Sequence, residues 1–138
     1  MRLYLDTSVL VPLFVSEVHT EAAKALLVEG SEVVVSDLTA VEFASALSRL
    51  VRMSLLDREA AQAGFAHLDF WIAKAASRVV VEAGDVRSAE AMLRSLDVPL
   101  TAPDVIHIAI ATRVHAELAT LDTRMADTAR KLGARVAG

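Results

Sequence analysis

The sequence predicts an α/β protein with a central parallel sheet that helices cover on both faces. Short apolar runs typical of buried strands alternate with longer segments of helical spacing, and this alternation favours a parallel sheet. Two of the runs, at 32–36 and 78–81, contain three consecutive valines, which suit strands better than helices. The chain has 138 residues, which suits a single domain spanning 1–138.

The N-terminal segments are expected to form a strand followed by two helices. Arg2–Leu5 is predicted to be a strand that enters the core. In the apolar segment Val9–Val15, Pro12 is predicted to lie in a first helical turn, where its missing N–H costs little. The segment His19–Glu29 has helical composition and is expected to stop at Gly30.

The next part of the chain predicts a buried strand and two long helices. The strand is Glu32–Ser36. Apolar residues at 43, 47, 50 and 51 have helical spacing and predict a helix over Leu38–Ser54. A further helix is expected over Asp57–Ala76, with Asp57 as its N-cap.

The second half of the chain repeats the alternation. A strand is expected at Arg78–Val81, then a helix at Asp85–Leu96, and Thr101 is predicted to open the helix Ala102–Arg113. The remaining elements are a strand, a helix ended by a glycine and a last short strand. They are expected at Glu117–Leu121, Asp122–Leu132 and Arg135–Ala137.

Composition limits the class of protein. Apolar residues make up 54% of the chain, yet no apolar run approaches the roughly 18 residues that a membrane span needs. The absence of cysteine excludes disulfides and thiolate metal sites, which fits a cytoplasmic protein, and no signal peptide is expected. The net charge of −4 argues against a protein that coats nucleic acid by bulk electrostatics, and leaves a local basic groove open.

Four acidic residues stand where helices are expected to begin: Asp6, Glu42, Asp104 and Asp122. Two of them, Asp6 and Asp122, directly follow strand-like apolar runs. In a parallel α/β sheet, the carboxyl ends of strands and the amino ends of helices share one edge, where ligands bind. The sequence therefore predicts that these carboxylates meet at that edge.

Each acid also has a simpler explanation as a helix cap. The two acids that follow strands can be ordinary N-caps. Thr39 and Glu42 have the spacing of a capping box, and Thr101 and Asp104 repeat that spacing. Taken singly, each residue is more easily explained as a cap, and only the set of four indicates a site.

A cluster of four carboxylates repels itself unless something neutralises it. At about 4 Å, each pair repels by roughly 4 kcal/mol at an effective dielectric of about 20, so either a pKa rises or a cation enters. Oxygen ligands without histidine or cysteine favour Mg²⁺ or Mn²⁺ over zinc. We therefore expect a metal-dependent enzyme with Asp6 and Asp104 as direct ligands. Asp122 is expected to complete the site, and Glu42 to bind directly or through water.

Small hydroxyl residues beside the acids fit a supporting shell. Ser8 and Thr120 are expected to orient carboxylates or metal-bound water, with ordinary capping as an equal alternative. His107 lies one turn after Asp104 in an otherwise apolar helix, so we expect a hydrogen-bonded packing residue rather than a ligand. Glycine-rich phosphate loops and the G-x-S-x-G nucleophile pattern are both absent, which disfavours those two chemistries.

Four segments resemble, in order along the chain, the four acidic motifs of the PIN-domain ribonucleases, and most closely those of the VapC-type toxins of toxin–antitoxin pairs. The segments are Tyr4–Leu10, Ser36–Phe43, Asp104–Ala109 and Thr120–Met125. Any one of them is little more than an acid beside apolar residues. Four in sequence on a chain of this length are specific, and no acid of the pattern is missing.

The resemblance implies an α/β/α sandwich around a parallel sheet of about five strands. It also implies a homodimeric, Mg²⁺- or Mn²⁺-dependent endoribonuclease that cleaves RNA, with transfer RNA and ribosomal RNA loops as target classes. A cognate VapB-like antitoxin, whose tail occupies the acidic groove, is the implied partner.

Two other functions stay open at the level of sequence. A phosphatase with an aspartyl nucleophile at Asp6 typically needs a second aspartate two residues later, where this chain has Ser8. The non-catalytic alternative is an acidic PIN-like interaction module that binds a basic partner peptide or sequesters metal. RNA cleavage that a chelator stops would separate the nuclease from both.

Overall fold

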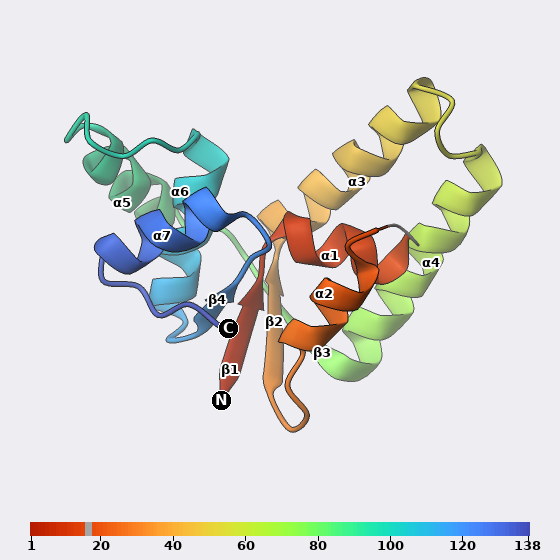
Figure 1. Cartoon of the computed structure of the whole chain (residues 1–138), viewed down its shortest axis with the longest axis horizontal. Helices are drawn as coiled ribbons and strands as arrows, with labels where there is room; N and C mark the ends of the chain where they lie inside the picture. Colours follow the sequence, from red (N-terminus) through yellow and green to blue (C-terminus); the bar gives the residue numbers. More distant parts are fainter. Residues whose placement is uncertain (16–17) are drawn as a thin grey trace.

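The centre of the molecule is a four-stranded parallel sheet with the strand order β3-β2-β1-β4. A computed structural model of the chain describes residues 1–15 and 18–138. The strands are β1 (Arg2–Leu5), β2 (Glu32–Ser36), β3 (Ala76–Val79) and β4 (Glu117–Ala119). The fold is therefore the predicted α/β class, with β1 in the interior of the sheet (Figure 1).

Helices cover both faces of this sheet, with α1 to α4 on one side and α5 to α7 on the other (Figure 1). Their bounds are α1 (Thr7–Phe14), α2 (Thr20–Leu26), α3 (Asp37–Arg52), α4 (Arg58–Ala75), α5 (Ala83–Leu93), α6 (Ala102–Arg113) and α7 (Thr123–Lys131). Over the described part of the chain, none of these helices has the length and apolar content that a bilayer crossing requires.

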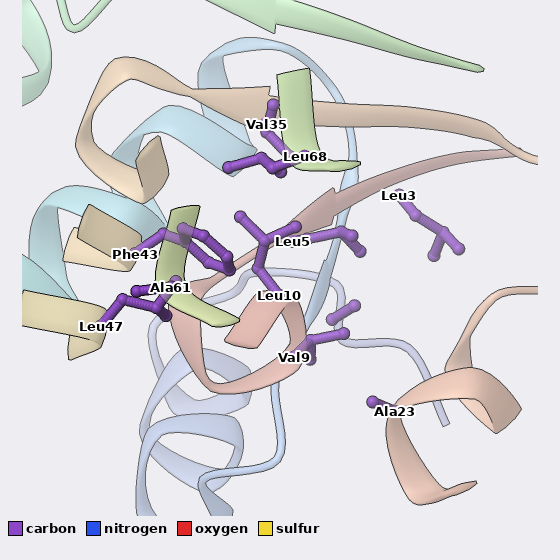
Figure 2. Packing of buried hydrophobic residues seen from close by; sticks show 11 residues of the cluster. Leu3, Leu5, Val9, Leu10, Ala23, Val35, Phe43, Leu47, Ala61 and Leu68 are labelled. Atoms are coloured by element: carbon purple, nitrogen blue, oxygen red, sulfur yellow. The ribbon is translucent and has the colours of Figure 1, made fainter. Parts of the chain in front are cut away.

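The alternation of side chains along the strands divides the core into two layers. Leu3 and Leu5 of β1 face α1 to α4, whereas Tyr4 between them faces the other side. The first layer also includes Val9, Leu10, Val35, Phe43, Leu47 and Leu68 (Figure 2). The second layer includes Val34, Ile108, Ile110, Leu118 and Met125. The sheet is thus buried on both faces, which is why its strands are apolar runs.

The strands follow the predicted bounds closely at the start of the chain and less closely later. β1 and β2 have the predicted bounds, whereas β3 begins two residues before the predicted start and β4 ends two residues before the predicted end. The predicted last strand is reduced to an isolated parallel bridge between Leu118 and Val136. The expectation of about five strands therefore corresponds to four strands and one bridge in the described residues.

Two predictions about helix starts are wrong. Asp6 caps α1, so Pro12 is the sixth helical residue rather than a member of the first turn, and the helix ends two residues later. The hydroxyl of Ser36 caps α3 and forms the capping box with Thr39, which places Glu42 in the second turn. Glu42 is therefore free of any capping role.

The expected box at the start of α6 is also incomplete. Thr101 is the N-cap residue, but its side chain makes no hydrogen bond to the helix backbone. Its hydroxyl donates instead to Oδ2 of Asp104 at 3.0 Å. Asp57 and Asp122, by contrast, accept hydrogen bonds from the backbone of the helices they precede, and the predicted N-cap at Asp57 is confirmed.

Candidate active site

Asp6 lies at the carboxyl end of β1 and is only 4% exposed. Its Oδ1 accepts hydrogen bonds from Ser8 Oγ at 2.6 Å and from the Val9 backbone N–H at 3.3 Å. Its Oδ2 accepts a hydrogen bond from Thr120 Oγ1 at 2.6 Å. Burial raises the pKa of Asp6 above its ordinary value, and the bonds from Ser8 and Thr120 oppose this rise only in part. The fold therefore holds a carboxylate whose charge is incompletely compensated.

Ser8 and Thr120 also connect Asp6 to the segment that follows β4. Thr120 Oγ1 accepts the backbone N–H of Asp122 at 3.1 Å, and Ser8 Oγ accepts the backbone N–H of Leu121 at 2.9 Å. The contact arises because β4 pairs directly with β1. The two hydroxyls that were predicted to support the acids contact Asp6 directly, while their part in catalysis stays a prediction.

Glu42 approaches the same edge from α3. Its Oε1 accepts hydrogen bonds from Thr7 Oγ1 at 2.9 Å and from Nε2 of His107. Partial burial disfavours the charged carboxylate, but the hydrogen bonds from His107 and Thr7 outweigh burial and hold the pKa of Glu42 below its ordinary value. Since Thr7 directly follows Asp6, this bond brings the Glu42 carboxylate next to the segment that carries Asp6.

Asp104 and Asp122 line an open depression of about 450 Å³ together with Arg124. Asp104 accepts from Thr101 through Oδ2 only, and Asp122 accepts from the Met125 backbone N–H at 3.1 Å through Oδ1 only. No donor within residues 1–15 and 18–138 reaches the second oxygen of either carboxylate. Each of these two acids therefore keeps one oxygen available to a ligand in the depression.

A second depression, of about 390 Å³, extends from Asp122 along α1 and is lined by Thr7, Ser8 and Pro12 among others. Asp122 thus lies between the two hollows, and the segment carrying Asp6 borders one of them. An extended ligand that crosses this edge of the sheet would meet the carboxylate of Asp122 from either hollow and that of Asp104 in the larger one.

Asp6, Glu42 and Asp122 are linked through Thr7 and Thr120 rather than by direct contact, whereas Asp104 is related to them by lining the same depression as Asp122. In the described part of the chain, no three histidine, cysteine, aspartate or glutamate side chains are arranged closely enough to hold a metal ion. The donors nevertheless fit Mg²⁺ in kind, because all are carboxylate oxygens and three of the acids keep an oxygen that no donor in residues 1–15 and 18–138 reaches. An ion would need those side chains to turn toward it, so the metal site stays a prediction.

His107 has more polar contacts than the sequence indicated. It is 2% exposed, as expected of a packing residue in α6, but its ring lies between Glu42 on Nε2 and the Tyr4 hydroxyl, 2.6 Å from Nδ1. The one signal that could have revealed this arrangement is Tyr4 itself, a polar group in a buried strand that must find a partner.

Comparisons with known proteins concern the sequence family and the fold of the whole chain. The sequence profile of the PIN domain matches residues 3–131. Similar solved structures include VapC20 of Mycobacterium tuberculosis, described as a sarcin–ricin loop cleaving toxin, at 17% identity and a TM-score of 0.72, covering 99% of each chain. VapBC2 of Rickettsia felis, bound to a DNA fragment from its promoter, has 13% identity and a TM-score of 0.70, covering 99% of this chain and 96% of that chain.

A toxin–antitoxin complex from Klebsiella pneumoniae is also similar, at 16% identity and a TM-score of 0.57, covering 88% of this chain and 87% of that chain. A comparison with curated protein sequences finds no match. Identities this low show a shared fold, whereas the PIN profile covers nearly the whole sequence and carries the family assignment. The chain belongs to the PIN-domain family.

Proposed function

We propose that this protein is a Mg²⁺- or Mn²⁺-dependent endoribonuclease and the toxin of a toxin–antitoxin pair. The observation that carries the proposal is the placement of Asp6, a buried carboxylate at the end of an interior strand. Thr120 joins it to the segment of Asp122, and the adjacent Thr7 joins it to Glu42. Membership of the PIN-domain family supports the same reading.

In the proposed mechanism, the carboxylates at this edge of the sheet would hold a metal ion, and the neighbouring hydroxyls would position those carboxylates. A metal ion held at this edge would supply an activated water and positive charge to balance that of the phosphate and the leaving 3′-oxygen. Asp6, Asp104 and Asp122 would hold the ion, and Glu42 would bind it directly or through water. Ser8 and Thr120 hold the two oxygens of Asp6 in place, because each hydroxyl donates to a different one.

Arg124 is a basic residue placed to bind the RNA backbone. It is exposed and lines the depression that contains Asp104 and Asp122. A guanidinium presents paired N–H donors that match a phosphate group, and its charge is permanent. Arg124 would therefore hold a phosphate oxygen beside the carboxylates, in a protein whose net charge is otherwise −4.

The proposed substrate is an RNA loop, and the proposed partners are a VapB-like antitoxin and a second copy of the chain. The likeness to VapC20, described as cleaving the sarcin–ricin loop, favours a ribosomal RNA loop, with transfer RNA as the other target class. Loops suit such a site because their unstacked bases leave the backbone accessible. The likeness to VapBC2 and to a toxin–antitoxin complex supports the antitoxin.

Cleavage of defined RNA hairpins tests the proposal. Purified protein is incubated with hairpins of the sarcin–ricin loop and with transfer RNA, with Mg²⁺, Mn²⁺ or EDTA. The expected result is cut RNA with either metal, none with EDTA, and none with the Asp6→Asn variant under any condition. Cleavage that persists in EDTA would contradict the metal requirement.

The non-catalytic alternative is a module whose exposed acids bind a basic peptide. The observation that favours it is the open depression in which Asp104 and Asp122 each keep a free oxygen, without a ready-made three-ligand cluster among the described residues. In the same assay, this alternative gives intact RNA in every metal. Tight binding of a basic peptide by wild-type protein would then establish it.

A further inference from the structure

A chain of buried hydrogen bonds runs from β1 to Glu42. The Tyr4 hydroxyl lies 2.6 Å from Nδ1 of His107 and 2.7 Å from Ser36 Oγ, and the Tyr4 side chain is fully buried. Nε2 of His107 is hydrogen-bonded to Oε1 of Glu42. His107 thus has one partner on each ring nitrogen, which fixes its ring between a strand and an acid of the candidate site.

The position of each proton along this chain of hydrogen bonds can be inferred from the acceptor that each donor reaches. Thr39 Oγ1 donates its proton to a backbone carbonyl 3.1 Å away, so it has none for Tyr4. Ser36 Oγ receives the Thr39 backbone N–H at 3.2 Å, and of the two hydroxyl oxygens near it that of Tyr4, at 2.7 Å, is closer than that of Thr39, at 3.2 Å, so we place the Ser36 proton on the bond to Tyr4. Tyr4 then donates to Nδ1 of His107. The ring carries its proton on Nε2, which an ionised Glu42 requires because a carboxylate only accepts.

The same bonds leave one oxygen of Glu42 open. Thr7 and His107 both donate to Oε1, and within residues 1–15 and 18–138 no donor reaches Oε2. In that part of the chain, every buried side-chain oxygen has a partner, so Oε2 is accessible to solvent. Two donors on one oxygen hold the carboxylate in a single orientation, with the other oxygen directed outward.

We propose that His107, held by the Tyr4 hydroxyl, is a positioning residue that keeps Oε2 of Glu42 presented to the metal ion or its bound water. This inference rests on the proposed nuclease function. His107 itself is too deeply buried to touch RNA. It acts by orienting Glu42, in the way that outer partners of metal ligands orient their carboxylates.

Two amide substitutions at His107 separate this role from simple packing. In His107→Gln, the amide nitrogen takes the place of Nε2 and can donate to Glu42. In His107→Asn, the shorter amide takes the place of Nδ1, so it reaches Tyr4 but not Glu42. Both variants place a neutral amide at the same buried position, so each serves as the packing control for the other.

We expect the His107→Asn variant to lose catalytic activity. Its kcat should drop about 10–100-fold, with a raised Mg²⁺ half-saturation and an unchanged KM for RNA. His107→Gln should stay within about threefold of wild type, because it restores the missing donor. The double variant His107→Asn with Glu42→Gln should be no worse than Glu42→Gln alone, since the two residues act as a unit. Equal losses in the Asn and Gln variants, or additive losses in the double variant, would overturn the proposal.

Two readouts do not depend on RNA cleavage. Nitrogen-15 NMR of wild-type protein should show His107 protonated on Nε2 and not on Nδ1, and Mn²⁺ titration should show weaker binding by His107→Asn than by His107→Gln. If wild-type protein cleaves no RNA, the proposed function fails while these measurements still test the link to Glu42. An Nδ1–H ring, or equal Mn²⁺ affinity in the two variants, would contradict the link even in an active nuclease.

Discussion

At the scale of single residues, Asp6 combines burial with a charge that the fold opposes. Its pKa in the folded protein is raised by burial above the unfolded value of about 3.9. The native state therefore binds the proton more tightly than the unfolded chain does. The stability that Asp6 contributes is fully present below the unfolded pKa and is lost as the pH rises through the folded pKa.

The Asp6→Asn substitution should remove this loss of stability at neutral pH, and it should also abolish RNA cleavage. In metal-free buffer at pH 7, the variant is expected to unfold at the same urea concentration as wild type or a higher one, because its neutral amide does not carry the cost of a buried charge. RNA cleavage should fall by more than the roughly 10–100-fold that losing an outer partner costs. Urea unfolding at pH 4 and pH 7 checks the sign, since the gain over wild type should be larger at pH 7. Magnesium-dependent cleavage by purified Asp6→Asn protein would refute the assignment.

Thr120→Val tests the hydroxyl that joins Asp6 to the Asp122 segment. The substitution keeps the shape of the side chain but leaves Oδ2 of Asp6 without its donor. Losing a hydrogen bond to a charged group should cost about 1.5–3 kcal/mol of unfolding free energy. The matched control is Thr112→Val, whose hydroxyl only donates to a carbonyl within α6 and whose loss should be smaller. Equal urea midpoints for the two variants would argue against the role of Thr120.

At the scale of elements, local sequence signals predict that a helix begins in a given region. They are less reliable in predicting which of several neighbouring polar residues is its N-cap. Asp57 fits its predicted capping role, and its side chain accepts the backbone N–H of Ala60; the flanking residues 55, 56 and 58 are leucines and an arginine, which do not cap helices. Thr39 and Glu42 have the spacing of a box, but Ser36 lies at the end of β2, where it caps the helix first and pairs with Thr39. A spacing rule cannot decide between two boxes that overlap, because the strand end that selects one is set by the sheet.

An ion pair that joins α5 to α6 is buried on the side of α5 and is not revealed by local sequence patterns. Arg113 on α6 donates from Nε to Asp85 at 2.8 Å, and Asp85 on α5 is 2% exposed. Arg113→Met should cost about 3 kcal/mol, the low end for a broken buried pair, because Arg113 is partly exposed. Arg94→Met is the control, since it removes an exposed pair with Glu90 and should cost less than about 1 kcal/mol. Similar urea midpoints for the two variants would contradict the importance of the buried pair.

At the scale of the whole molecule, the alternation of apolar runs and helices predicted the fold class but not the strand order. The site depends on that order. Thr120 meets Asp6 only because β4 pairs with β1, and Thr7 meets Glu42 because β2 lies on the other side of β1. Sheet neighbours far apart in sequence leave no local signal. The acids themselves were predictable, whereas the contact of His107 with Glu42 was not.

Binding of a divalent ion should stabilise the folded molecule through this site. At a free Mg²⁺ concentration ten times the Kd, the gain is about 1.4 kcal/mol, which raises the melting temperature by a few degrees. Asp6→Asn should lose this increase, because the proposed ligand is gone, while Arg94→Met should keep it. A calorimetric scan with Mg²⁺ and with EDTA checks the effect. An equal shift in wild type and Asp6→Asn would place the stabilising ion elsewhere.

A crystal structure of the wild-type protein grown with Mn²⁺, with the ion located by anomalous scattering, tests the proposed metal site most directly. The predicted result is an ion at the carboxyl edge of the sheet, bound by oxygens of Asp6 and Asp104, with Asp122 and Oε2 of Glu42 bound directly or through water. An ion that avoids these four carboxylates, or an edge that stays empty at saturating Mn²⁺, would contradict it.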